Sequence, residues 1–151
     1  NCPGQIVVSG TVQGVKGIIE RGKEIGAKRV IPLEVSGPFH SSLMKPAAER
    51  LQEVLAGIDM QDAKVPVIAN VTAHPVTNGD EIRRLLVDQV VSPVLWEDSV
   101  RWLLAQGVDT FVEIGPGAVL SGLIRKIDRS ATVLTVNSCE SVQAAVEALQ
   151  G

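Results

Sequence analysis

The sequence offers few side chains that could carry acid–base chemistry, and His40 is the best placed of them. It is one of two histidines, and it follows Gly37, Pro38 and Phe39 between an apolar run and a helix that Ser42 can cap. A rigid turn here would hold an imidazole at the end of a strand. A neutral imidazole accepts a proton near neutral pH, which suits a general base. From spacing alone, a packing or capping histidine remains the commoner case.

A general base needs a group that orients its ring, and the residues alone leave that group open. Glu34 precedes His40 on the same apolar run, and Glu113 lies far along the chain. A backbone carbonyl could orient the ring equally well. The second histidine, His74, stands before Pro75 in a polar segment and is interpreted as a turn residue. A nucleophilic serine is not evident, because the GxSxG pattern is absent.

The stretch Gly115-Pro116-Gly117 separates an apolar strand pattern from a helical one. Small residues at the start of a helix can bind an anion, so a phosphate- or nucleotide-binding module is one interpretation. The offset of Gly122 does not complete a GxGxxG pattern. A tight turn that requires unusual φ values is the other interpretation, and it needs no ligand.

Charge and composition exclude some classes of function. The net charge is −3, whereas a nucleic-acid-binding surface needs concentrated positive charge. Lys28 and Arg29 are adjacent cations on this acidic chain, either simply solvated or a docking point for an acidic partner. No apolar run reaches the ~18 residues of a membrane span. The first residue is Asn1 rather than Met, so we expect a piece of a longer protein.

The two cysteines indicate the compartment. Cys2 and Cys139 lie far apart in the sequence and form no metal-binding spacing. Two lone thiols are more typical of the reducing cytoplasm than of a disulfide framework. The sequence therefore predicts a cytoplasmic protein without a metal site.

The elements that must position these residues alternate between strand and helix. Helices are predicted at 11–25, 43–56, 80–90, 96–105, 118–127 and 142–149. Strands are predicted at 5–10, 29–35, 65–69, 110–114 and 132–136. Short apolar strands separated by helices indicate a three-layer α/β fold with a mainly parallel sheet. Ligands bind such sheets at the carboxyl ends of the strands, where the turn that holds His40 is expected to lie.

Five segments together resemble the malonyl-CoA:acyl-carrier-protein transacylases of bacterial fatty-acid synthesis. They are NCPGQIVVSG, GAKRVIPLEVSGPFHSSLMKPAAERL, VPVIANVTA, DQVVSPVLW and VEIGPGAVLSGLIRKI. The resemblance implies an α/β-hydrolase-like large domain with an inserted ferredoxin-like small subdomain. Residues 1–35 would form the second half of the small subdomain, and 36–151 the C-terminal part of the large domain. The family's serine nucleophile, in a GHSLGE-type segment, lies upstream of the matched region, so we expect the N-terminal half as a partner.

The resemblance also implies a reaction. His40 matches the catalytic base, and Gln89 matches the residue whose main-chain carbonyl orients that base. The family moves malonyl from malonyl-CoA, through a serine ester, to the phosphopantetheine thiol of acyl carrier protein. No bound cofactor is expected beyond the substrates.

Four further residues match positions with family roles. Phe39 and Asn70 would belong to the substrate-binding site, with Asn70 placed behind the residues that touch substrate. A bulky residue before the histidine goes with malonyl rather than methylmalonyl, because it leaves no room for an α-methyl group. Lys28 and Arg29 match a basic pair linked to carrier-protein docking.

Three functions therefore remain in comparison at this point. The first is one half of an acyltransferase that needs its N-terminal partner. The second is a phosphate- or nucleotide-binding α/β module that uses Gly115–Gly117 and is indifferent to His40. The third is a fragment that binds a carrier protein without catalysing transfer.

Overall fold

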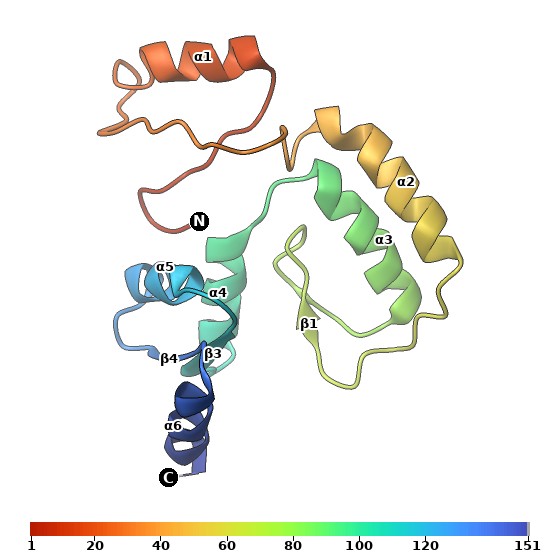
Figure 1. Ribbon diagram of the computed structural model, residues 1–151, viewed down its shortest axis with the longest axis vertical. Coiled ribbons are helices and arrows are strands. Elements are labelled where there is room, and N and C mark those ends of the chain that lie inside the picture. Colours follow the sequence, from red (N-terminus) through yellow and green to blue (C-terminus); the bar gives the residue numbers. More distant parts are fainter. Residues whose placement is uncertain (151) are drawn as a thin grey trace. The chain divides into compact units, whose positions relative to one another are not determined.

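The computed structural model describes residues 1–150, which divide into two compact units (Figure 1). Unit 1 combines Asn1–Ile6 with the chain from Leu95 onward, and unit 2 is Val7–Val94. None of the helices within 1–150 is both long enough and apolar enough to cross a lipid bilayer. The candidate residues from His40 to Gln89 all lie in unit 2.

Unit 2 is built on a pair of packed helices. Its elements in chain order are α1 (Val12–Arg21), the 3-10 turn η1 (Ser42–Met44), α2 (Lys45–Ala56), β1 (Val67–Ile68), β2 (Pro75–Val76) and α3 (Gly79–Val91). The helices α2 and α3 lie side by side (Figure 1), and Ala48, Leu55 and Leu85 are buried. Strands β1 and β2 form an antiparallel hairpin in which Val67 pairs with Val76.

Polar side chains begin two helices of unit 2, whereas the cap expected at Ser42 is wrong, because Ser41 caps η1. Thr11 accepts a hydrogen bond from the Gly14 N–H and begins α1. Asn78 accepts one from the Glu81 N–H and begins α3. The first turn of α3 carries acidic side chains, whose negative charge is stabilised by the positive end of the helix dipole. The helix expected at 11–25 ends earlier, at Arg21.

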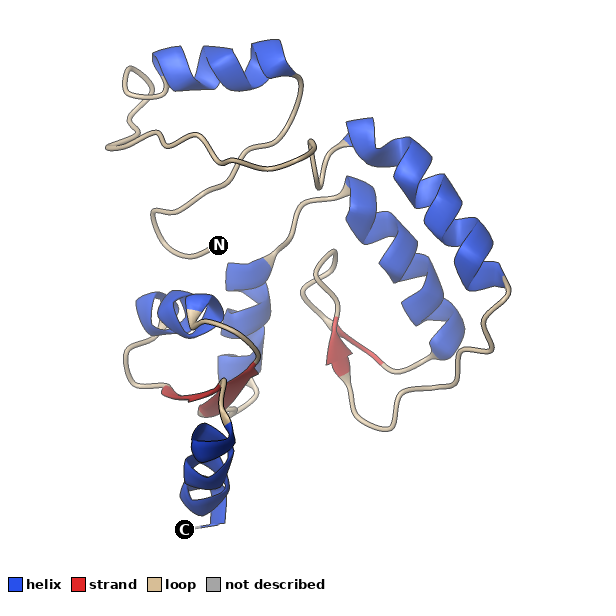
Figure 2. Cartoon of the chain, viewed as in Figure 1, coloured by secondary structure: helices blue, strands red, loops and turns tan. Residues whose placement is uncertain are grey.

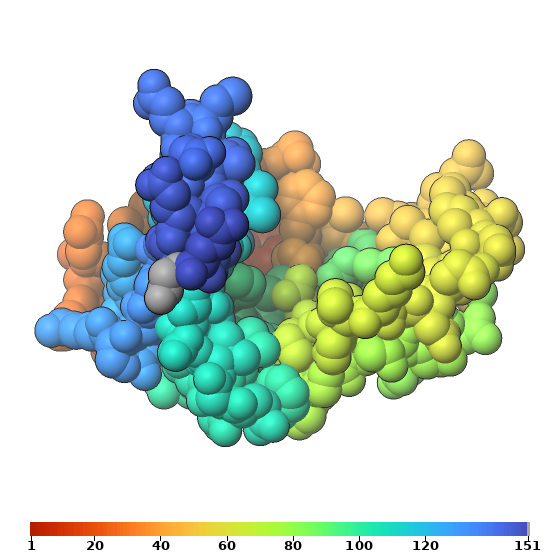
Figure 3. Space-filling model, turned by 90° about the horizontal axis from the view of Figure 1, so that it is seen from below, coloured from red at the N-terminus to blue at the C-terminus, as the bar shows by residue number. Residues whose placement is uncertain are grey.

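Unit 1 is a strand–helix–strand arrangement flanked by two more helices. Its elements are α4 (Trp96–Ala105), β3 (Thr110–Ile114), α5 (Val119–Ile127), β4 (Thr132–Val136) and α6 (Cys139–Gln150). Strands β3 and β4 are parallel, and Thr110 pairs with Thr132. The buried apolar side chains described in this unit are Cys2, Val100, Leu123, Ile124 and Ala145. Helix α6 lies at the surface, in dark blue in Figure 3.

The strands predicted at 5–10 and 29–35 are wrong for this structure. Both segments lack strand pairing apart from a bridge between Cys2 and Gln5, and Figure 2 draws them as loops on either side of α1. Their apolar side chains are exposed, for example Ile6 at 86% and Leu33 at 58%. Strand preference depends on cross-strand packing, and neither segment has a neighbouring strand within 1–150.

The predicted single sheet also differs from the structure. The chain is of the α/β class, but residues 1–150 form two separate two-stranded sheets, one antiparallel and one parallel. The antiparallel pairing comes from β2, a short strand inside a segment expected to be loop. The subdomain boundary expected at residue 35 stays a prediction.

Candidate active site

His40 lies in a strained turn that its neighbours close. Its φ is 59°, in the left-handed region that costs a non-glycine residue ~1–2 kcal/mol. The Ser41 hydroxyl donates to the Pro38 carbonyl oxygen at 2.7 Å, bridging the turn across His40. The same hydroxyl accepts from the Leu43 N–H at 3.4 Å, which ties the turn to η1. The turn thus presents an exposed imidazole on a defined backbone, as expected for a functional residue.

A main-chain carbonyl orients the ring. His40 Nδ1 lies 2.9 Å from the carbonyl oxygen of Gln89. Because a carbonyl oxygen can only accept, Nδ1 carries the hydrogen and Nε2 remains an acceptor. Of the three candidate partners (Glu34, Glu113 and a backbone carbonyl), the structure contains the backbone carbonyl. In the neutral ring, Nε2 is therefore the nitrogen that can accept a proton.

The sequence itself leaves the Gln89 carbonyl without a helical partner. In an α-helix this oxygen would accept from the N–H four residues later, and that residue is Pro93, which has none. Helix α3 ends at Val91, and Ser92 is extended, with φ −114° and ψ 154°. The oxygen lies in the last turn of α3, where carbonyl groups lack donors within the helix. The Gln-x-x-x-Pro spacing is thus the signal in the sequence that points to this carbonyl.

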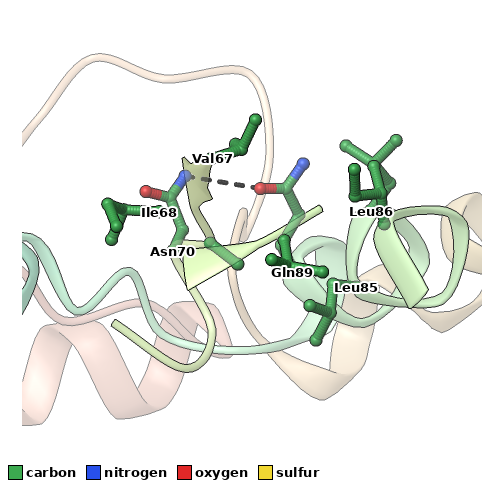
Figure 4. A pocket seen from close by; sticks show the side chains of 9 residues that line it. Val67, Ile68, Asn70, Leu85, Leu86 and Gln89 are labelled. Atoms are coloured by element: carbon green, nitrogen blue, oxygen red, sulfur yellow. Dashed lines mark hydrogen bonds between the residues drawn. The ribbon is translucent and has the colours of Figure 1, made fainter. Parts of the chain in front are cut away.

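Asn70 lies beside Gln89, as Figure 4 shows. Its Nδ2 donates to Gln89 Oε1 at 3.3 Å, and both residues are partly buried. They form the polar part of a pocket of about 150 Å³ whose other walls include Val67, Leu85 and Leu86. Gln89 therefore contacts His40 through its backbone and Asn70 through its side chain.

The other residues matched by resemblance are at the surface of unit 2. Phe39 is 44% exposed next to His40. Lys28 and Arg29 are exposed after the turn at Gly26, whose φ is 102°. Within residues 1–150, neither cation forms an ion pair with an acidic side chain. Both side chains are accessible to solvent.

The Gly115-Pro116-Gly117 segment is a tight turn. Gly115 and Gly117 have φ values of 142° and 88°, which favour glycine. Two amide groups in the first turn of α5 are already occupied, because Glu113 accepts from Leu120 N at 3.0 Å and from Ser121 N at 2.7 Å. A carboxylate in this position repels a phosphate. The nucleotide-binding interpretation therefore loses its proposed anion site.

The same contacts make Glu113 a stabilising group. Hydrogen bonds from the Ser121 hydroxyl, and then from the Ser121 and Leu120 N–H groups, lower the pKa of Glu113 below its ordinary 4.5. Ser121 is fully buried, and its hydroxyl also lies 3.1 Å from that of Thr135 on β4. The carboxylate thus links β3 to α5.

We expect Glu113→Gln to lower the stability of the chain at pH 7. The folded-state pKa is below the unfolded value, so the stabilisation is fully present above about pH 4.5 and is lost as the pH falls through the folded pKa. The difference in free energy of unfolding between the parent chain and Glu113→Gln should therefore shrink below pH 4.5. Urea unfolding at several pH values measures it, with the exposed helix residue Glu147→Gln as control. A gap that does not depend on pH would contradict the assignment.

The second histidine and the two cysteines take no part in the contact between His40 and Gln89. His74 is exposed in a bend, and its Nδ1 lies 2.7 Å from the Thr72 carbonyl oxygen, in keeping with a turn residue. Cys2 and Cys139 are both free, the first buried and the second exposed.

Comparison with known proteins gives consistent matches. The acyl transferase domain family matches residues 1–146. The malonyl CoA-acyl carrier protein transacylase of Bacillus subtilis is 55% identical over 150 residues, which are 99% of this chain and 47% of that protein. The Staphylococcus aureus protein of the same name is 50% identical and covers 95% of this chain and 46% of its own length.

Solved structures match at the level of the fold. The acyl-carrier-protein S-malonyltransferase of Bartonella henselae superposes with a TM-score of 0.89 at 40% identity, over 94% of this chain and 45% of that one. A malonyl transacylase in complex with a type II polyketide synthase acyl-carrier protein gives 0.88 at 40% identity, over 92% and 45%. The expected α/β acyltransferase fold is thereby confirmed. The chain spans about half the length of the curated relatives that it matches.

Proposed function

Since this chain belongs to the acyl transferase domain family, we propose that it forms the C-terminal half of a malonyltransferase. The enzyme would move malonyl from malonyl-CoA to the phosphopantetheine thiol of an acyl carrier protein. The contact that carries the proposal is the one between His40 Nδ1 and the Gln89 carbonyl, since it leaves Nε2 of an exposed ring as a base. Two free thiols support a cytoplasmic location.

In the first half-reaction, His40 Nε2 takes the proton of a serine hydroxyl that the N-terminal half supplies. The serine oxygen attacks the thioester carbonyl of malonyl-CoA, the carbon–sulfur bond breaks, and the imidazolium gives its proton to the departing thiolate. The positive ring that forms between these steps faces the Gln89 carbonyl in the last turn of α3.

The second half-reaction runs in the opposite sense. Nε2 takes the proton of the phosphopantetheine thiol, and the sulfur attacks the malonyl ester. The ester carbon–oxygen bond breaks, and the imidazolium returns its proton to the serine oxygen. Lys28 and Arg29 are proposed to guide the acidic carrier protein to the site.

The exposed segments on either side of α1 support a partner within the same enzyme. Residues 5–10 and 29–35 combine strand-forming sequences with exposed apolar side chains. Such segments are stable once a further strand pairs with them. We propose that the N-terminal half, which carries the serine, supplies that pairing.

The experiment is a chimera that joins the N-terminal half of the Bacillus subtilis relative to this chain, which we name the complemented enzyme. We expect it to transfer malonyl from malonyl-CoA to acyl carrier protein, measured by mass spectrometry of the carrier. The intact Bacillus protein is the positive control. A folded chimera that binds the carrier without transferring malonyl would instead support the non-catalytic alternative.

Replacing Phe39 by serine should relax the choice of acyl group. Removing the ring beside His40 makes room for an α-methyl group, and one methyl group in a pocket discriminates by ~1–3 kcal/mol. We therefore expect the malonyl to methylmalonyl ratio of kcat/KM to fall about 10-fold in the complemented enzyme. Leu43→Ser, which removes another exposed apolar side chain nearby, is the control. An unchanged ratio would refute the steric explanation.

A further inference from the structure

The side chains of Asn70 and Gln89 connect the segment after β1 to the last turn of α3. Gln89 is also the residue whose carbonyl oxygen contacts His40. Asn70 follows β1, and its amide donates to the Gln89 side chain, as Figure 4 shows. The Gln89 backbone in turn accepts from His40 Nδ1. The chain of contacts therefore runs from Asn70 through Gln89 to the imidazole.

We propose that Asn70 is a positioning residue, which holds Gln89 so that its carbonyl aims the His40 ring. This inference rests on the proposed function, because it assumes that His40 is the base of the malonyltransferase. Asn70 would act through Gln89 and need not touch the substrate.

Gln89 needs such support because it lies in the last turn of α3. Its carbonyl oxygen has no helical donor at Pro93, so this oxygen lacks the hydrogen bond that fixes carbonyls in the interior of a helix. Helix ends fray when their terminal groups have few partners. A tether at the Gln89 side chain restricts the residue whose oxygen must stay 2.9 Å from the ring.

Asn70 is a suitable anchor because backbone hydrogen bonds fix the turn in which it lies. The Ala69 N–H donates to the His74 carbonyl oxygen at 3.1 Å, and the Ala73 N–H donates to the Ala69 carbonyl oxygen at 2.8 Å. These bonds close the turn between β1 and β2. The Asn70 amide meets Gln89 at a partly buried pocket whose other lining side chains are mostly apolar.

The test compares variants of similar shape in the complemented enzyme. Asn70→Leu and Gln89→Met each remove the amide contact, fit an apolar pocket, and keep the Gln89 carbonyl. We expect each to lower kcat for malonyl transfer about 10-fold while KM for malonyl-CoA stays the same, since small misplacements of a catalytic group reduce rate strongly. The double variant should be no slower than either single one, because both changes remove the same contact.

Matched variants separate positioning from general damage. Gln89→Glu keeps an acceptor for Asn70 and should retain more of kcat than Gln89→Met. Gln143→Met removes an exposed amide bond within α6, from Gln143 to Glu147, and should leave kcat unchanged. An unchanged kcat in Asn70→Leu, a change confined to KM, or additive losses in the double variant would each overturn the proposal.

A second readout does not depend on activity. The ¹⁵N shifts of the His40 imidazole, assigned with His40→Gln, report which nitrogen carries the hydrogen. We expect the Nδ1–H form to dominate in the complemented enzyme and to lose population in Asn70→Leu. The same tautomer populations in both proteins would overturn the positioning role even if malonyl is transferred. Failure of transfer in the parent protein would contradict the proposed function and leave this comparison intact.

Discussion

His40→Ala in the complemented enzyme is expected to slow malonyl transfer at least ~100-fold, the usual contribution of a general base. The side chain that takes the serine proton would be missing, while the turn that carries it should persist. Alanine lacks the branched side chain that is most costly at the positive φ of this position. Acylation by malonyl-CoA and transfer to the carrier, measured separately, should both be slow, because the base acts in each half-reaction.

His74→Ala is the matched control for this variant. It removes the other histidine of the chain, in an exposed bend, and should leave both half-reactions intact. Full malonyl transfer by the His40→Ala protein would contradict the catalytic role. A loss in only one half-reaction would contradict a base that serves both.

Reversing the charges of Lys28 and Arg29 together is expected to lower kcat/KM for acyl carrier protein about 10- to 100-fold, in the range of electrostatic effects on association rates. Both cations are exposed and unpaired within residues 1–150, so they are available to attract an acidic protein. Acylation by malonyl-CoA should keep its rate. Steady-state kinetics with varied carrier concentration measures the change.

Two experiments test whether Lys28 and Arg29 act through their charge: a change of ionic strength, and a charge reversal elsewhere on the chain. The loss should shrink as ionic strength rises, because salt screens exposed charges over ~10 Å at 0.1 M. Reversing Lys126 and Arg129, both exposed in unit 1, changes the net charge equally and should have little effect. An equal loss from this control would show that net charge, and not this basic pair, governs the encounter.

Elements whose stabilising contacts are close in sequence were predictable. The strands at 110–114 and 132–136 and the helix at 96–105 have the bounds that their patterns indicate. Each pairs or packs with a neighbour a short distance along the chain, as β3 does with β4. Local periodicity therefore contained the information that these elements needed.

The segments at 5–10 and 29–35 have equally strong strand patterns and are not strands. A β pattern indicates an apolar, extended segment, but a strand also needs a partner for its backbone. The short strand β2 shows the converse, since a hairpin partner makes a strand of two residues in a polar segment. The presence or absence of a partner strand, which the pattern of a single segment does not show, decided both cases.

At the site, the sequence alone determined that a histidine follows a Gly-Pro-Phe turn and that Pro93 denies the Gln89 carbonyl a helical donor. It did not determine from its residues which group would orient the imidazole, and it gave no sign of the bond between Asn70 and Gln89. Only the tertiary structure decided these, because His40 and Gln89 are 49 positions apart and Asn70 and Gln89 are 19 apart. Contacts across such distances depend on how α3 packs beside η1 and the hairpin, which no local pattern encodes.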